Sequence, residues 1–363
     1  MSNAEAELKI LLENPVLIYG AGSMGRRAAV ALKELGTDVL GIAVTSMCSN
    51  VDMLCGYTVK EIERWRDCAK KAVVLIASFN YQKDMIQTCK ACGFENIIAM
   101  DFGIDSVFCS VYIKSILTSH DVDLRGEFIQ MGGGYYMNPF TQLEKDAAQY
   151  IYIEELEEFI LPPLFDEWED VREGTYELGE VMVSSGDVVF DLGAHYGVFS
   201  VYAASKGAKS YAFEPTTQLG KNIERLSELN NGEIHLVPYA VSNVCEKTQF
   251  YVSDYTCGNS LIKRECHFGA GENSSTIMVD QITIDEFVKR NNIPSVDFIK
   301  ADIEGAERLM LEGAQETLEE FAPKLALCTY HLPDDKEVMT ELILKANPDY
   351  KIEYKWKKLY AHI

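Results

Sequence analysis

The chain has 363 residues, of which 47% are hydrophobic, and it carries a formal net charge of −23 at pH 7. The length suits two or more domains with packed cores. The negative charge repels nucleic-acid phosphates and anionic lipid headgroups, so we expect neither nucleic acid nor a membrane as a partner. Because no signal segment opens the sequence, we expect the 10 cysteines to be reduced and the protein to be cytoplasmic.

Residues 1–102 alternate helical patterns with short apolar runs, which is typical of parallel strands joined by helices. One helix is expected in the first fifteen residues, and another ends at Gly36. Together these elements predict a smaller, doubly wound, Rossmann-like domain. The CxxC pair of Cys89 and Cys92 has no second pair nearby and is expected to be structural. Strands are expected at 15–19, 39–44, 73–77 and 97–100.

The segment Gly-Ala-Gly-Ser-Met-Gly at 20–25 is a G-x-G-x-x-G motif between a strand and a helix, which is the context of a dinucleotide site. The second strand, however, ends at 42–46 without an acid for an NAD ribose. Three interpretations remain open: a nucleotide or nucleotide-sugar site, a degenerate fold that supports a homodimer, and an NAD oxidoreductase domain. The last lacks a Tyr-x-x-x-Lys pair, and the homodimer is favoured.

Residues 103–180 break this alternation and are expected to form a helical connector or lid. A helix is predicted from about 141 to 161, where Pro162 and Pro163 end it. The acidic residues between 154 and 170 could form a cation site, but such a run is more typical of one solvated helix face.

Residues 181–363 return to alternating strands and helices, which predicts a larger second α/β domain. A more polar stretch between 244 and 282 contains an alternating hairpin strand at 248–252. The other strands are expected at 188–192, 210–214, 234–238, 296–302, 324–330, 351–354 and 359–361, and the helices at 197–205, 216–229, 284–291 and 305–319.

The turn Asp-Leu-Gly-Ala-His-Tyr-Gly that begins at Asp191 follows an apolar strand and opens a helix. Its two glycines and its carboxylate are poor for a pyrophosphate and suit an adenosyl amino acid. We expect Asp191 to act on the ammonium of the methionine part, Gly193 to let the ligand approach, and Gly197 to let the helix pack closely. Glu214 closes the next strand and is placed to bind ribose hydroxyls. The backbone at Ala240 is expected beside the adenine.

The sequence at 176–335 resembles the FkbM family of methyltransferases. Its most telling part is 300–307, a lysine, a spacer, an acid, a spacer and then Glu-Gly-x-Glu. The resemblance implies a class I methyltransferase fold with a Rossmann-like seven-stranded sheet, the cofactor S-adenosyl-L-methionine, and methyl transfer to a hydroxyl of a sugar, glycan or other natural product. The segments that carry it are 186–194, 213–215, 240–242, 283–285, 299–307 and 330–331.

The competing interpretation is a non-catalytic regulatory protein that binds a nucleotide or S-adenosylmethionine, and the retained acids argue against it. His195 stands where the family often has asparagine, and it either caps the helix or faces the substrate. The expected cofactor-binding residues are Asp191, Gly193, His195, Gly197, Glu214, Ala240 and Asp302.

Catalytic groups are expected at the carboxyl ends of the fourth and fifth strands. A hydroxyl acceptor needs a base, for which Asp302 and His331 are candidates, and Glu304 is expected to hold substrate or cofactor. Glu307 is expected to be a carboxylate of the first helical turn. A metal-assisted mechanism with Asp302 and Glu304 stays open as an alternative. No His/Cys cluster supports zinc, and the oxygen ligands are too few to commit to magnesium, so no metal site is predicted.

Overall fold

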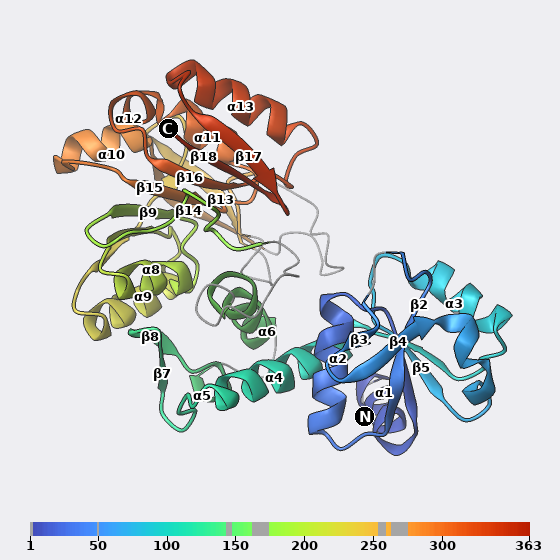
Figure 1. Cartoon of the computed structure of the whole chain (residues 1–363). Helices are drawn as coiled ribbons and strands as arrows, with labels where there is room; N and C mark the ends of the chain where they lie inside the picture. Colours follow the sequence, from blue (N-terminus) through green and yellow to red (C-terminus); the bar gives the residue numbers. More distant parts are fainter. Residues whose placement is uncertain (1–2, 49–50, 143–146, 162–173, 253–258, 263–274) are drawn as a thin grey trace. The chain divides into compact units, whose positions relative to one another are not determined.

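The computed structural model describes residues 3–48, 51–142, 147–161, 174–252, 259–262 and 275–363. The chain divides into two compact units, Met1–Val122 and Asp123–Ile363 (Figure 1). Each unit has its own sheet and is described by itself. The boundaries at 102 and 180 that the sequence favours stay a prediction. Within the described ranges, no helix is both long enough and apolar enough to cross a bilayer.

The N-terminal unit is built on a six-stranded sheet in the order β3-β4-β2-β1-β5-β6. Its central strand β1 pairs in parallel with β2 and β5, as the βαβ pattern predicts. Val16 and Ile18 belong to one hydrophobic core and Leu17 and Tyr19 to another, so β1 is buried on both faces. The strands are β1 Val16–Tyr19, β2 Val39–Val44, β3 Met53–Leu54, β4 Tyr57–Glu61, β5 Val73–Ile76 and β6 Ile97–Ala99.

The helices of this unit are held by short polar contacts at their ends and between them. Asp101 caps α4, because its carboxylate accepts the amide of Ile104 at 2.8 Å. Arg27 in α2 and Asp105 in α4 form a buried ion pair at 3.1 Å, which gives Arg27 a structural role. The helical elements are α1 Asn3–Glu13, α2 Ser23–Glu34, η1 Ile62–Cys68, α3 Gln82–Ala91 and α4 Phe102–Ser119.

The glycine turn at 20–25 is tightly packed against itself. A Cβ on Gly25 would lie 2.0 Å from the carbonyl oxygen of Gly20, so the first turn of helix α2 requires glycine at this position. Cys89 and Cys92 form no disulfide. Burial raises the pKa of Cys89 to about 12, so its thiol stays protonated and unreactive, as expected for a structural cysteine. Nucleotide binding and dimerisation by this unit stay predictions.

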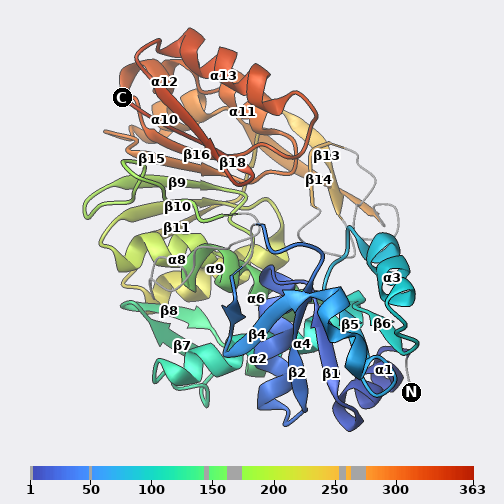
Figure 2. The same cartoon turned by 45° about the vertical axis from the view of Figure 1, so that its right-hand side comes forward.

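The C-terminal unit contains a seven-stranded sheet in the order β11-β10-β9-β15-β16-β18-β17 (Figure 2). The central strand β9 pairs in parallel with β10 and β15, and β18 runs antiparallel to both β16 and β17. Carboxyl ends of β9, β10 and β15 therefore meet at one edge. The strands are β9 Val188–Leu192, β10 Lys209–Phe213, β11 Ile234–Val237, β15 Phe298–Ala301, β16 Lys324–Cys328, β17 Lys351–Lys355 and β18 Lys358–His362, and each coincides with a predicted strand to within a few residues.

The helices of this unit follow the predictions with two differences. The single helix expected at 305–319 is two helices, which meet at Gly313 and Ala314. A Cβ on Gly313 would lie 2.4 Å from the carbonyl oxygen of Ser242, so glycine is required there. Helix α13 was not predicted. The helices are α8 Val198–Ser205, α9 Thr217–Leu229, α10 Ile284–Asn291, α11 Glu307–Glu312, α12 Gln315–Glu320 and α13 Asp335–Ala346.

Before the sheet, the chain forms a hairpin and a helical segment. The hairpin of β7 (Phe128–Met131) and β8 (Gly134–Met137) packs on α8, since a Cβ on Gly134 would lie 2.8 Å from Val201 Cγ1. The segment predicted as one helix at 141–161 contains α5 (Pro139–Gln142), α6 (Ala147–Glu155) and the π-helical turn η2 (Leu156–Ile160). Residues 143–146 lie outside the described residues.

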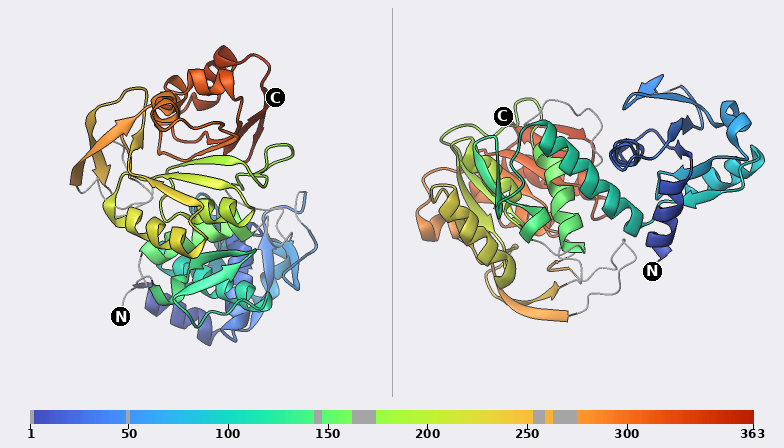
Figure 3. Two further views of the ribbon diagram at one scale, coloured as in Figure 1. Left: turned by 90° about the vertical axis from the view of Figure 1, so that its left-hand side faces the viewer. Right: turned by 90° about the horizontal axis from the view of Figure 1, so that it is seen from below.

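A small three-stranded sheet, β12-β14-β13, lies beside the main one. The strand predicted at 248–252 is β13 (Lys247–Val252), and it pairs antiparallel with β14 (Ser275–Ile282) (Figure 3). Strand β12 (Ala240–Val241) pairs in parallel with β14.

Candidate active site

The turn after β9 lies at the carboxyl end of the central strand. The amides of Gly193 and Ala194 donate to the carbonyl of Phe213, at 3.2 and 3.0 Å, at the end of β10. Gly193 has a φ of +73°, and a Cβ there would lie 2.0 Å from the carbonyl oxygen of Asp302. Close packing of the turn on the chain after β15 therefore demands this glycine, independently of any ligand.

Asp191 is completely buried just before this turn. Its Oδ2 accepts a hydrogen bond from Ser200 Oγ at 2.7 Å, and its Oδ1 lies 3.0 Å from Lys300 Nζ. Lys300 Nζ also donates to the carbonyl of Gly193 at 2.8 Å. Burial opposes the charge on Lys300, but Asp191 and Asp302 outweigh it and raise the pKa of Lys300. The pair thus holds the turn, and direct action of Asp191 on an ammonium stays a prediction.

His195 has a φ of +51°, which is uncommon for a residue with a side chain. Its Nδ1 is hydrogen-bonded to the carboxylate of Glu155 in α6. Burial opposes the charge on His195, but Glu155 raises the pKa of His195. The N-cap of α8 is Gly197, so the interpretation of His195 as a cap is wrong. Glu155 is bound to His195, and Glu157 is buried, so these two acids do not form the solvated face that was expected.

Gly197 and the helix behind it are also closely packed. Gly197 has a φ of +81°, and a Cβ on it would lie 3.2 Å from Ile223 Cγ1 in α9. The close approach that this glycine permits is therefore between α8 and α9, rather than between the helix and its own strand.

The acidic residues at 166–170 lie outside the described residues.

Glu214 lies directly after β10 and is 6% exposed. Its Oε1 accepts hydrogen bonds from the amide and the hydroxyl of Thr216, at 2.8 and 2.6 Å. Its own amide donates to the carbonyl of Val237 at 3.1 Å, which sets the end of β11 beside it. Ala240 lies shortly after the end of β11, and its side chain is buried in β12 of the small sheet. Contacts of Glu214 with a ribose and of Ala240 with an adenine stay predictions.

Replacing Glu214 with glutamine should stabilise the protein more at neutral than at acidic pH. Burial raises the pKa of Glu214 despite the hydrogen bonds from Thr216, so its ionisation costs folding free energy as the pH rises from the unfolded pKa through the folded pKa. Glutamine does not ionise, and the gain in free energy of unfolding should be larger at about pH 7 than at about pH 4. Urea denaturation measures both values, with exposed Glu233→Gln as a control that gains nothing. An equal gain at the two pH values would contradict this.

Asp302 lies just after β15, where its amide donates to the carbonyl of Leu192 at 3.1 Å. Its Oδ2 accepts a hydrogen bond from the Tyr176 hydroxyl at 2.8 Å. Its Oδ1 is buried and accepts no hydrogen bond from any residue that the structure describes. Burial opposes ionisation, but the charges of His331 and of two lysines lower the pKa of Asp302. A carboxylate is thus held beside the glycine turn.

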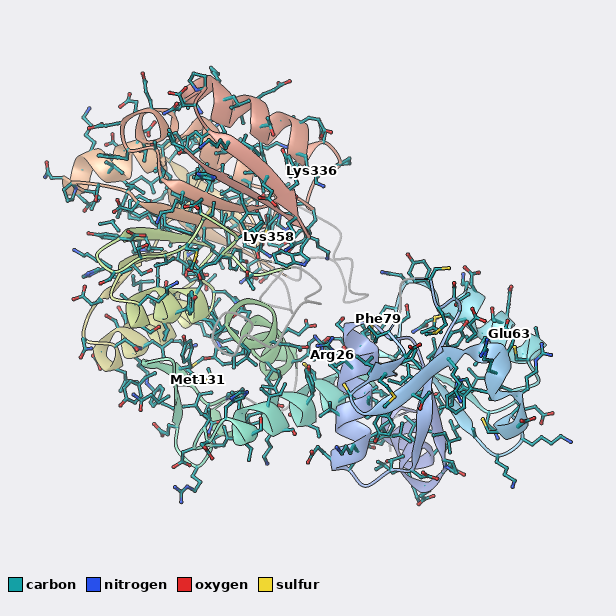
Figure 4. The ribbon with its side chains drawn as sticks, in the orientation of Figure 1. Arg26, Glu63, Phe79, Met131, Lys336 and Lys358 are labelled. Atoms are coloured by element: carbon teal, nitrogen blue, oxygen red, sulfur yellow. The ribbon has the colours of Figure 1, made fainter. Side chains whose placement is uncertain are left out.

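Tyr176 is flanked by the two lysines. The Nζ atoms of Lys300 and Lys358 lie 5.2 and 4.6 Å from its ring centroid. Lys358, which Figure 4 labels, is in β18 and donates to the carbonyl of Gly174 at 2.7 Å. Burial raises the pKa of Tyr176 well above its ordinary value, so its hydroxyl keeps the proton that it donates to Asp302.

His331 follows β16, and its side chain is completely buried among three carboxylates. Its Nδ1 lies 3.1 Å from Glu307 Oε1, and its Nε2 lies 3.7 Å from Asp302 Oδ1 and 3.6 Å from Glu304 Oε1. Burial opposes the charge on the ring, but Glu307 and Glu304 raise the pKa of His331 to about 11. The three predicted catalytic residues therefore lie together.

Glu307, the first residue of α11, is itself held by two amides. Its Oε1 accepts the amide of Ile303 at 2.9 Å, and its Oε2 accepts the amide of Gly305 at 3.0 Å. It is thus the first-turn carboxylate that was expected, with the additional contact to His331. Glu304 has a φ of +55°, a left-handed conformation that turns the chain sharply before the helix.

The predicted residues around the glycine turn and those around His331 meet at one edge of the sheet, whereas Ala240 belongs to the small sheet. Reasoning from the sequence missed Lys300, Tyr176 and Glu155. Lys300 had a signal, because it lies in the segment 300–307 and its strand was expected in the same parallel sheet. Tyr176 and Glu155 had none, because each reaches the site from a segment before the sheet.

Comparison with known proteins finds a family match within the C-terminal unit. Residues 191–352 match the family described as the methyltransferase FkbM domain. The hexuronic acid methyltransferase AglP of Haloferax volcanii is 25% identical over 160 residues, which make up 44% of this chain and 62% of that protein. The chain thus aligns with less than two thirds of this curated relative.

Two solved structures are similar at lower levels. The methyltransferase FkbM from Methylobacillus flagellatus KT has 17% identity and a TM-score of 0.43, with coverage of 100% of this chain and 94% of that one. A putative rRNA-methylase from Clostridium thermocellum has 11% identity and a TM-score of 0.31, with coverage of 50% and 88%. The match over 191–352 and the similarity to AglP thus make this part of the chain similar to the FkbM family of methyltransferases.

Proposed function

We propose that the C-terminal unit has the class I methyltransferase fold and transfers a methyl group from S-adenosylmethionine to a hydroxyl of a sugar or glycan. The observation that carries this proposal is the meeting of three groups at one sheet edge. The glycine turn lies after β9, Glu214 after β10, and Asp302 after β15. Ligands of open α/β sheets bind in such a place.

The residues at this edge fit the cofactor. The amides of the turn are held against β10, and the Glu214 carboxylate, nearly buried beside them, can accept hydrogen bonds from vicinal ribose hydroxyls. Lys300 and Asp191 act as positioning residues, because they hold the turn from within. S-adenosylmethionine, when bound, supplies the methyl group.

The acceptor would lie at Asp302, Glu304 and His331. Methyl transfer needs alignment of the acceptor oxygen and exclusion of water, and a nearby base eases the loss of the hydroxyl proton. Of the two candidates, Asp302 and His331, we propose Asp302 as that base, with Glu304 holding the acceptor. The pKa of His331 is raised to about 11, so its ring already carries a proton at neutral pH. Asp302 has the freer geometry, since its Oδ1 accepts no hydrogen bond from the described residues while His331 Nδ1 faces Glu307. The similarity to a hexuronic acid methyltransferase supports a sugar acceptor.

Isothermal titration with S-adenosylmethionine tests the cofactor assignment. We expect the wild type to bind and Glu214→Ala to bind at least about tenfold more weakly, since one charge-assisted hydrogen bond contributes about 1.5–3 kcal/mol. Glu233→Ala is the matched control. No measurable binding to the wild type would refute the proposal. Asp302→Asn and His331→Ala, assayed for transfer to uronic acids, test the base: if both turn over like the wild type, neither residue is the base.

A further inference from the structure

We propose that Asp302, Glu304 and His331 bind a divalent transition-metal ion. The three side chains offer one nitrogen and two oxygen ligands, and these atoms all lie within 4.8 Å of one another. They come from the ends of two adjacent strands, β15 and β16, so the backbone holds them in place.

The separations suit ligands that share an ion. Metal–ligand bonds of about 2.1 Å place neighbouring ligand atoms about 3.0–3.4 Å apart. His331 Nε2 lies 3.6 Å from Glu304 Oε1 and 3.7 Å from Asp302 Oδ1. Rotations that move the carboxylate oxygens by a few tenths of an ångström would bring these two pairs into range.

Asp302 supplies a second, independent observation. Tyr176 binds its Oδ2, while its Oδ1 is buried and accepts no hydrogen bond from the described residues. Buried polar atoms nearly always have a partner, and an ion can provide it. The oxygen that needs a partner is the one nearest to His331.

The surroundings of His331 are those of a metal-binding histidine. A ligating imidazole usually directs its other ring nitrogen at a carboxylate, which sets the orientation of the ring. Glu307 Oε1 lies 3.1 Å from His331 Nδ1, and the amides of Ile303 and Gly305 hold that carboxylate in turn. His331 Nε2 is thereby turned toward Asp302 and Glu304.

The donor set indicates the class of metal. One imidazole with two carboxylates suits Mn²⁺, Fe²⁺ or Zn²⁺ better than Mg²⁺, which favours oxygen ligands alone. Three protein ligands leave positions open for water or for an acceptor hydroxyl, whose pKa the ion would lower. This role in the reaction rests on the proposed function, whereas binding of the metal does not.

Metal titration of the full chain tests the site. Protein stripped with a chelator is titrated calorimetrically with Mn²⁺, Zn²⁺ and Mg²⁺ in separate runs, and Mn²⁺ binding is also followed by loss of the free-ion electron paramagnetic resonance signal. We expect one Mn²⁺ or Zn²⁺ per chain, and at least about tenfold weaker binding in Asp302→Asn and in Glu304→Gln. Asp334→Asn, an exposed acid in the loop after His331, should bind like the wild type.

The outcomes separate the metal site from the proposed function. Circular dichroism checks that each variant folds. Because the Glu304 side chain is partly exposed, Glu304→Gln is the variant least prone to misfold. The metal site is overturned if the wild type binds neither Mn²⁺ nor Zn²⁺. It is also overturned if both variants bind the metal as tightly as the wild type does. If S-adenosylmethionine still binds in that case, the proposed function stands. If the metal binds but S-adenosylmethionine does not, the proposed function fails and the metal site stands.

Discussion

Replacing Gly193 with alanine should destabilise the C-terminal unit by more than about 3 kcal/mol and abolish binding of S-adenosylmethionine. A left-handed backbone costs a residue with a Cβ about 1–2 kcal/mol. The larger part of the loss comes from the clash, because the Cβ would lie 2.0 Å from the carbonyl oxygen of Asp302. That oxygen belongs to the backbone and cannot rotate away, so β9 and the chain after β15 must separate.

Gly232→Ala is the matched control for this experiment. Gly232 has the same φ of +73°, but nothing lies within 4 Å of its Cβ position. Its replacement should cost only the conformational part, about 1–2 kcal/mol. Urea denaturation gives both free energies of unfolding, and calorimetric titration gives cofactor binding. Equal losses of stability in the two variants would show that the contact with Asp302 does not determine the packing of the turn.

Replacing Lys300 with methionine should cost about 3–5 kcal/mol, because it leaves a buried carboxylate without its counter-charge. Asp191 is completely buried, and its Oδ1 lies 3.0 Å from Lys300 Nζ. The turn would also lose the hydrogen bond from Lys300 to the carbonyl of Gly193. We therefore expect weaker binding of S-adenosylmethionine together with the loss of stability.

The second substitution Asp191→Asn, added to Lys300→Met, should recover part of the stability, because the unpaired charge is then removed as well. Lys324→Met is the control on the neighbouring strand. Its ion pair with Asp187, at 2.9 Å, is partly exposed, and its loss should cost about 1 kcal/mol or less. Thermal and urea denaturation of the four proteins measure these differences. Equal losses in Lys300→Met and Lys324→Met would contradict the role of burial.

Patterns of neighbouring residues were enough to predict the strands of the seven-stranded sheet. The segment 188–192 was predicted as a strand with the same bounds as β9. Its residues are apolar except for Asp191, and such a run suits a strand that is buried on both faces. The helix at 305–319 was predicted as one, whereas the structure divides it at Gly313. Gly313 is a local signal for a helix end that the prediction did not use, whereas its contact with the carbonyl of Ser242 arises only in the folded chain.

Part of the site was predicted from the sequence and part was missed. Asp302, Glu304 and His331 were expected together because they follow adjacent parallel strands. The structure places His331 Nε2 3.7 Å from Asp302 Oδ1 and 3.6 Å from Glu304 Oε1. Tyr176 was missed, although it donates to Asp302, because 126 positions separate the two residues in the sequence. A contact of that kind depends on how a preceding segment folds back on the sheet.

The sequence by itself determined the strands of the seven-stranded sheet, most of the helices around it, the two glycine turns and the acids at the strand ends. Each of these depends on residues that are close along the chain, where periodicity and spacing act directly. Only the tertiary structure decided which charges meet: Lys300 with Asp191, Glu155 with His195, and Glu307 with His331. The energy of a buried charge depends on the distance to its partner and on burial, and both arise only when the strands assemble.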